Sequence, residues 1–181
     1  MDKKMITLNL RNGKTMEIPC NYQDFILDYS GTPEGSGWDK EDVIYILKCV
    51  KENRLDELEL DASLMNSIGC FFNDGICVKP DIEKAVYWYE QAIKEDDDLA
   101  RSNLADILRK GSQGYPKDLK RAFELYKACG LPYAHYRCGE FYEKGWGTEI
   151  DLDKAKAYYQ QAYKEGHGLA IKKLKEWNFM E

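Results

Sequence analysis

The sequence predicts a mainly α-helical repeat array, or solenoid, that follows a small N-terminal β-hairpin. The array is predicted by a pattern of small and aromatic residues that occurs three times, each time split by a glycine-containing loop. The third copy runs from Ala134 to Leu169, and a further copy begins at Ala170. Copies starting at 64, 100, 134 and 170 give a period in the mid-thirties, which is typical of stacked helix pairs. Alternating apolar and polar residues between Met5 and Ile18 predict the hairpin.

The predicted hairpin has two candidate registers around the turn at residues 11 to 13. A two-residue turn would place the acidic Glu17 opposite Leu8, whereas a three-residue loop places Met16 there. We prefer the second register because it gives one apolar face. A lone hairpin is marginal in water, so we expect this face to pack on the helices.

Each end of the array is expected to carry a covering helix, because solenoid ends would otherwise expose their core. Asp39 can cap a helix that runs to about Asn53. The apolar positions of that helix are Val43, Ile44, Ile46, Leu47 and Val50. At the other end, Trp177 and Phe179 offer apolar surface to the third unit.

We therefore divide the chain at about residue 60. Residues 1–60 hold the hairpin, a loop and the first capping helix, and residues 61–181 hold the repeats, at about 64–99, 100–133 and 134–169, with a C-terminal capping helix at 170–181. The middle repeat is the short one, because Ala122 and Ala134 are 12 positions apart where the other repeats have 15. Its second helix is predicted to be about one turn shorter, and Pro132 cannot continue it.

Within the repeats, residue types recur at positions with distinct structural roles. Small residues that let the two helices of a unit approach closely are Gly69, Ala105 and Gly139. Aromatic residues predicted to fill the core are Tyr89, Tyr126 and Tyr159. Left-handed ends of the first helices are predicted at Gly75, Gly111 and Gly145. Caps of the second helices are predicted at Asp81, Asp118 and Asp151.

The third copy is the most complete and carries a family resemblance. Its marks are Ala134, Cys138-Gly139, Tyr142, Gly145 and Gly147, followed by Asp151, Lys154-Ala155, Tyr158-Tyr159 and Ala162. This pattern resembles the Sel-1-like repeat, a relative of the tetratricopeptide repeat, over residues 64 to 181. The first copy departs from it at Cys77 and the second at Ala105. The resemblance implies a right-handed α/α superhelix of antiparallel helix pairs that acts as a protein-interaction scaffold, without catalytic residues and with the opening helices on the concave side.

The charge and cysteine content restrict the classes of partner and compartment. A net charge of −6 disfavours nucleic acid and anionic membrane as main partners, because both require a basic face. With no long apolar run and no signal-peptide core, we expect a cytoplasmic protein. Of the six cysteines, Cys129 and Cys138 fall at repeat positions that are apolar and predicted to be buried in the other copies. We therefore favour free buried thiols over a disulfide at these two positions. No Cys-x-x-Cys pair is present and neither histidine clusters with the cysteines, so we expect no metal and no cofactor.

The core columns leave one face of the opening helices unassigned, and we hypothesise that it binds a partner. Its residues are Asn66, Cys70 and Asn73, then Ser102, Asp106 and Arg109, then Tyr136, Glu140 and Glu143. Their chemistry differs between copies, which suits a groove that reads a peptide; the alternative is a merely solvated face. We expect Tyr136 to be an exposed anchor. Asp106 and Glu140 predict an acidic centre, and therefore a partner segment that carries Lys or Arg.

Two function classes remain open from the sequence. The favoured one is a non-enzymatic adaptor that holds a protein or peptide in the concave groove. The alternative is an inhibitor or immunity-type protein that docks on an enzyme through residues 1 to 38. No motif for nucleophilic, phosphate-binding or calcium chemistry is present, and the lysines at 172, 173 and 175 are expected to form an exposed face.

Overall fold

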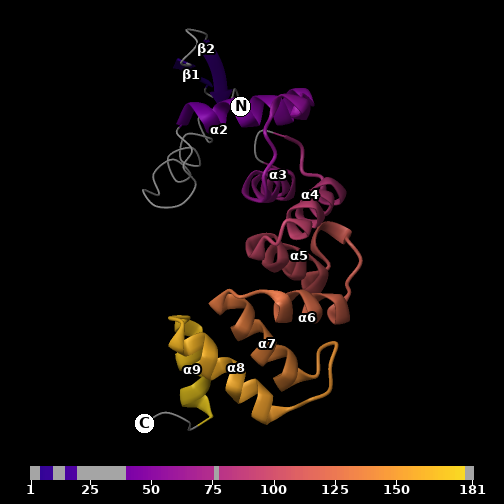
Figure 1. Ribbon diagram of the computed structural model, residues 1–181, viewed down its shortest axis with the longest axis vertical. Helices are drawn as coiled ribbons and strands as arrows, with labels where there is room; N and C mark the ends of the chain where they lie inside the picture. The colour runs from indigo at the N-terminus through magenta and orange to yellow at the C-terminus, as the bar shows by residue number, and fades with distance from the viewer. Residues whose placement is uncertain (1–4, 10–14, 20–39, 76–77, 178–181) are drawn as a thin grey trace.

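The computed structural model describes residues 5–9, 15–19, 40–75 and 78–177. Figure 1 shows an elongated array, with the hairpin and α2 at one end and α8 and α9 at the other. The array bends, since α2 and α9 both lie to the same side of α5 and α6 (Figure 1). In the described part of the chain, no helix combines the length and apolarity needed to span a bilayer.

The N-terminal part contains the two strands and the first helix. Strands β1 (Met5–Asn9) and β2 (Thr15–Pro19) pair antiparallel, with Leu8 opposite Met16 and Ile6 opposite Ile18. This is the register that gives one apolar face, but the expected packing of that face rests on side chains outside the described set. Helix α2 (Lys40–Glu52) follows, and its Ile46 and Val50 are buried in the same core as the repeats. Asp39, proposed as its cap, lies outside the described residues.

The repeats form three helix pairs and one further helix. After a short 3-10 turn (Leu55–Glu57), the pairs are α3 (Ala62–Asp74) with α4 (Ile82–Lys94), α5 (Asp98–Lys110) with α6 (Leu119–Ala128), and α7 (Pro132–Lys144) with α8 (Leu152–Lys164). Helix α9 (Gly168–Glu176) closes the array, and the Trp177 ring packs edge-on against Tyr159. The opening helices begin 36, 34 and 36 residues apart, which are the periods read from the sequence. Phe179 lies outside the described residues.

The middle unit is shorter in the way the sequence predicted. Helix α6 has 10 residues, against 13 in α4 and in α8. A 3-10 turn (Ser112–Gly114) takes up the longer loop before it. Pro132 is the first residue of α7, where its missing N–H costs no hydrogen bond and its fixed φ suits a helix start.

The predicted helix ends are confirmed. The opening helices α3, α5 and α7 end at glycines with φ of 70°, 70° and 67°, and the N–H of each glycine bonds the helix's last turn. A left-handed residue is needed there, and glycine adopts it without a side-chain clash. The second helices begin at Asp81, Asp118 and Asp151, whose carboxylates each accept a hydrogen bond from the N–H three residues on.

The predicted core columns are also confirmed. Tyr89, Tyr126 and Tyr159 are fully buried, and two of them lie directly on a glycine of the opening helix. A Cβ added to Gly69 or Gly139 would lie 2.6 Å from the ring of Tyr89 or Tyr159, which is far inside contact distance. The glycine therefore sets how closely the two helices of a unit can pack.

Two cysteines occupy core positions as the sequence indicated. Cys129 and Cys138 are buried and are free thiols. Burial raises the pKa of Cys138 to about 12, so its thiol stays protonated at neutral pH and behaves as a small hydrophobic group. Cys20 and Cys77 lie outside the described residues.

Candidate functional site

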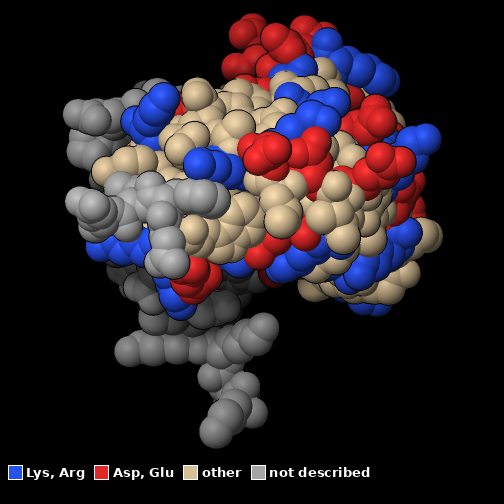
Figure 2. Space-filling model, turned by 90° about the horizontal axis from the view of Figure 1, so that it is seen from below, with Lys and Arg blue, Asp and Glu red and all other residues tan. Residues whose placement is uncertain are grey.

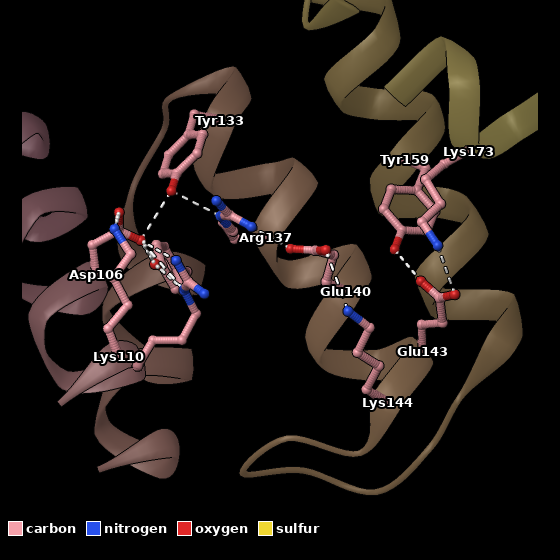
Figure 3. A network of polar contacts seen from close by, with 11 residues as sticks. Asp106, Lys110, Tyr133, Arg137, Glu140, Glu143, Lys144, Tyr159 and Lys173 are labelled. Atoms are coloured by element: carbon pink, nitrogen blue, oxygen red, sulfur yellow. Dashed lines mark hydrogen bonds and ion pairs between the residues drawn. The ribbon is translucent and has the colours of Figure 1, made fainter. Parts of the chain in front are cut away.

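The residues proposed as a groove form one polar row across the opening helices. Three hydrogen bonds between successive opening helices join it. Asn103 of α5 donates to Asn66 of α3 at 3.0 Å, and Tyr133 of α7 donates to Asp106 of α5 at 2.9 Å. Lys173 of α9 donates to Glu143 of α7 at 2.9 Å. The row therefore runs from α3 to α9, and its part from α5 to α9 is shown in Figure 3.

This row is less exposed than the sequence analysis assumed. The members that are buried are Asn66, Ser102, Tyr136 and Glu140. Tyr136, expected to be an exposed anchor, is only 7% exposed, so that expectation is wrong. Its ring packs 5.5 Å from the ring of Tyr159 and 4.9 Å from that of His167, centroid to centroid. The following helices cover Tyr136, so truncating it would test folding and not binding.

Asp106 is the centre of the middle part of the row. Its carboxylate accepts hydrogen bonds from the hydroxyls of Tyr126 and Tyr133 and from the side chains of Arg109 and Lys110. Burial alone would raise the pKa of Asp106, but the bonds from Lys110, Tyr126 and Tyr133 outweigh it and lower the pKa to about 2. Asp106 is therefore ionised, and this internal pair holds the Arg109 side chain in place.

The next two carboxylates are paired in the same manner. Glu140 accepts from Arg137 at 2.5 Å and from Lys144 at 3.5 Å. Arg137 also donates to the Tyr133 hydroxyl at 2.8 Å, so three hydrogen bonds in series connect Glu140 to Asp106. Glu143 accepts from the Tyr159 hydroxyl at 2.5 Å and from Lys173. Burial would raise the pKa of Glu143, but these bonds lower it.

We call this set the charged seam. It consists of Asp106, Arg109, Lys110, Arg137, Glu140, Glu143, Lys144 and Lys173. The seam overturns the expectation of an acidic groove, because five cationic side chains meet three carboxylates. Cations still outnumber carboxylates when Glu176, 3.9 Å from Lys173, is counted. The reason is that Arg137, Lys144 and Lys110 approach from helix positions that the sequence stripe did not include.

Two components of the seam were missed by sequence reasoning. The core tyrosines were assigned to packing alone, yet the hydroxyls of Tyr126 and Tyr159 reach seam carboxylates. The recurrence of tyrosine instead of phenylalanine in that column was an available signal, since a buried hydroxyl requires a partner. Lys173 was read as part of an exposed face, but its side chain is 21% exposed and pairs with Glu143.

A small pocket opens beside the seam. It has a volume of about 240 Å³ and is lined by Arg109, Lys110, Lys117, Leu119 and Trp146. Its walls come from the end of α5, the loop before α6, the first residue of α6 and the loop after α7. Across the described residues, no group of three or more histidines, cysteines and carboxylates is placed to hold a metal ion.

The profile of the Sel1 repeat family matches residues 62–97, 99–128 and 132–167. The chain belongs to the Sel1 repeat family. Its three matched stretches coincide with the helix pairs α3–α4, α5–α6 and α7–α8. Proteins with Sel1 repeats generally act as protein-interaction or regulatory scaffolds.

Two yeast proteins are similar to part of this chain. The Activator of C kinase protein 1 of Saccharomyces cerevisiae is 32% identical over 103 residues, which are 51% of this chain and 16% of that protein. A chitin synthase regulator of the same yeast is 32% identical over 102 residues, which are 54% of this chain and 15% of the regulator. The match therefore spans only about a sixth of the length of these relatives.

A solved Sel1 repeat protein has the same fold. The crystal structure from Oxalobacter formigenes superposes with a TM-score of 0.61 at 25% identity, covering 75% of this chain and 98% of that one. The expected class, a solenoid of antiparallel helix pairs, is confirmed. The alternative function through residues 1 to 38 falls on a region of which only 5–9 and 15–19 are described.

Proposed function

We propose that this Sel1 repeat protein is a non-enzymatic adaptor that holds a segment of a partner protein along the charged seam. The observation that supports this is the continuity of the seam, in which hydrogen bonds fix charged side chains across α5, α7 and α9 (Figure 3). Side chains that are already ordered lose little entropy when a partner binds, so their contacts contribute more fully to affinity.

The accessible part of the seam is its lysines. Lys110 and Lys144 end α5 and α7 and have side chains 52% and 39% exposed, while Asp106, the partner of Lys110, is 24% exposed. A partner can therefore reach the ammonium groups without disturbing the buried tyrosines beneath. The regulatory names of the two yeast relatives are consistent with an adaptor role. A cytoplasmic location belongs to the same proposal, and the free thiols Cys49, Cys70, Cys129 and Cys138 fit a reducing compartment.

The test is capture of partners by the tagged full chain, quantified by mass spectrometry. The seam variant is Lys110→Glu with Lys144→Glu. The matched control is Lys94→Glu with Lys164→Glu, which makes the same charge change at exposed last positions of α4 and α8. We expect proteins enriched by the wild type to be lost with the seam variant and kept with the control. The control should melt within about 0.5 kcal/mol of the wild type. The seam variant loses the pairs of Lys110 with Asp106 and of Lys144 with Glu140 and should melt lower, so capture is compared at a temperature at which circular dichroism shows all three to be folded.

Two results would count against the proposal. Equal capture by the seam variant and the wild type would show that the seam is not the binding surface. If the wild type enriched no protein over an untagged control, the adaptor function itself would be contradicted.

A further inference from the structure

The pocket beside the seam differs from the rest of the surface in its local charge. Three cationic side chains line it and no carboxylate does. Asp118, next to Lys117 in the sequence, is engaged elsewhere, since its carboxylate accepts from the N–H of Arg121 at 2.9 Å and caps α6. Asp106 is therefore the one carboxylate among the described residues that pairs with the pocket's cations, through Arg109 and Lys110.

The remaining positive charge is unbalanced. Lys117 is exposed and forms no ion pair with any residue in the described ranges. Lys144 adds a further cation at the rim, because its Nζ lies 4.3 Å from the centroid of the Trp146 ring. With the seam, the described side chains here comprise six cations, Arg109, Lys110, Lys117, Arg137, Lys144 and Lys173, against the three carboxylates Asp106, Glu140 and Glu143.

Two of the pocket's residues are apolar and are fixed in place. Leu119 and Trp146 are partly buried against the core, and the Trp146 ring meets Phe141 edge-on at 5.6 Å. The loop after α7 and the start of α6 touch through their backbones at Gly147, where an added Cβ would lie 2.5 Å from the carbonyl oxygen of Leu119. A glycine is needed at this contact, so the position of this loop relative to the start of α6 is set by backbone and not by flexible side chains.

Among the described residues, the end of the molecule that carries α8 and α9 has no comparable local excess of one charge (Figure 2). Figure 2 views the molecule from the end that carries α8 and α9, and acidic and basic side chains are interspersed across it. The whole chain carries a net charge of −6, so its long-range field does not attract an acidic partner. Charges beyond about 8 Å are screened at physiological salt, however, and the local excess of cations then decides which side chain is accepted.

We infer that this pocket receives an acidic segment of the partner, with an Asp or Glu carboxylate against Arg109, Lys110 and Lys117 and a neighbouring aromatic or aliphatic side chain against Leu119 and Trp146. This inference rests on the proposed adaptor function and gives the partner a charge opposite to that expected from the sequence. A carboxylate is the group that a guanidinium and two ammonium groups bind best. The apolar neighbour gains area against a fixed indole ring.

The first experiment selects random dodecapeptides displayed on phage against the immobilised full chain. We expect the enriched peptides to carry Asp or Glu next to Phe, Tyr, Trp, Leu or Ile. Enrichment of Lys- or Arg-rich peptides, or of peptides without charge bias, would overturn the acidic partner while leaving the adaptor function standing. Failure to enrich any peptide would count against both.

The second experiment uses a fluorescent synthetic copy of the most enriched peptide. Lys117→Glu should weaken its binding about fivefold, and Lys117→Gln by less, because exposed ion pairs each change affinity only modestly. Substitutions of Lys117 test binding without disturbing the fold, since replacing it breaks no ion pair among the described residues. The control Lys164→Glu, at an exposed site on α8, should bind as the wild type does. Equal weakening by Lys117→Glu and Lys164→Glu would show that net charge acts and not the pocket.

Discussion

The middle and third repeats show how two copies of one pattern can solve the same packing problem differently. In the third repeat the ring of Tyr159 lies directly on Gly139, where an added Cβ would sit 2.6 Å from it. In the middle repeat the equivalent position is Ala105, whose methyl is fully buried beside an equally buried Tyr126. Equivalent positions in the two repeats are therefore equally buried. The distance from each position to the core tyrosine, and so the size of side chain that fits there, differs between the units.

The polar contacts of the two repeats differ as well. The middle repeat places Asp106 under four donors, two of them tyrosine hydroxyls. The third repeat gives Glu143 one tyrosine and one lysine. The middle unit thus has the shorter second helix but the more densely bonded carboxylate.

The largest expected effect comes from substitutions at the small residues that lie against the core tyrosines, Gly69, Ala105 and Gly139. Gly139→Leu should lower the free energy of unfolding by about 3 kcal/mol, and Gly139→Ala by about 1 to 2 kcal/mol, because each forces the buried Tyr159 ring away. Gly69→Ala should behave like Gly139→Ala, since Tyr89 occupies the same place. The measurement is urea unfolding followed by circular dichroism.

The reverse change in the middle repeat is the matched control. Ala105→Gly adds no atoms, so it should leave the Tyr126 ring in place and cost about 1 to 2 kcal/mol, through helix propensity and a lost buried methyl. If Gly139→Ala proved neutral, the close contact between the glycine and Tyr159 would not exist in solution.

The second prediction concerns pH and the carboxylate of the middle repeat. The folded pKa of Asp106 is lowered from 3.8 to about 2, so the unfolded chain binds its proton first as the pH falls. The stabilisation by Asp106, about 2 kcal/mol, should be complete above about pH 4 and be lost between about pH 4 and pH 2. Asp106→Asn should remove this part of the pH dependence.

The measurement is the difference in unfolding free energy between wild type and variant at several pH values in that range. Asp153→Asn, at an exposed position in the first turn of α8, is the control and should leave the profile unchanged. A difference between wild type and Asp106→Asn that stayed constant from pH 6 to pH 2 would mean that the carboxylate is not held as the structure shows.

The smallest effect compares the helix caps. Asp118→Ala and Asp151→Ala each remove an acceptor from a backbone N–H at the start of α6 or α8, and each should cost about 1 kcal/mol. Thermal melting can resolve this against Glu124→Ala, an exposed position within α6 that caps nothing. We expect Asp118→Ala to cost at least as much as Asp151→Ala, because α6 has fewer internal bonds to retain it. A larger cost for Asp151→Ala than for Asp118→Ala would argue that the cost of losing a cap does not depend on helix length.

Most of the array could be predicted from the sequence, because each feature depends on neighbours a few residues away. The αL glycines and the capping aspartates act within one turn, and the register of the columns repeats with the helix pairs. Even the shortened α6 could be located by counting positions between Ala122 and Ala134.

The candidate site could not be predicted to the same degree. Tyr136 was assigned to the surface because no core column of its own repeat includes it, yet His167 and Tyr159 cover it in the folded chain. The charge of the seam was misjudged for a related reason, since Arg137 and Lys144 join it from positions off the predicted stripe.

The sequence by itself determined the repeats, their boundaries and the residues that end and pack their helices, since these are local and periodic properties. Only the tertiary structure decided which polar side chains are accessible and which charges meet. Those outcomes depend on how each opening helix stacks on the next, as the bonds Tyr133 to Asp106 and Lys173 to Glu143 show. The stacking joins residues about thirty positions apart, and no local pattern records the angle at which successive units pack.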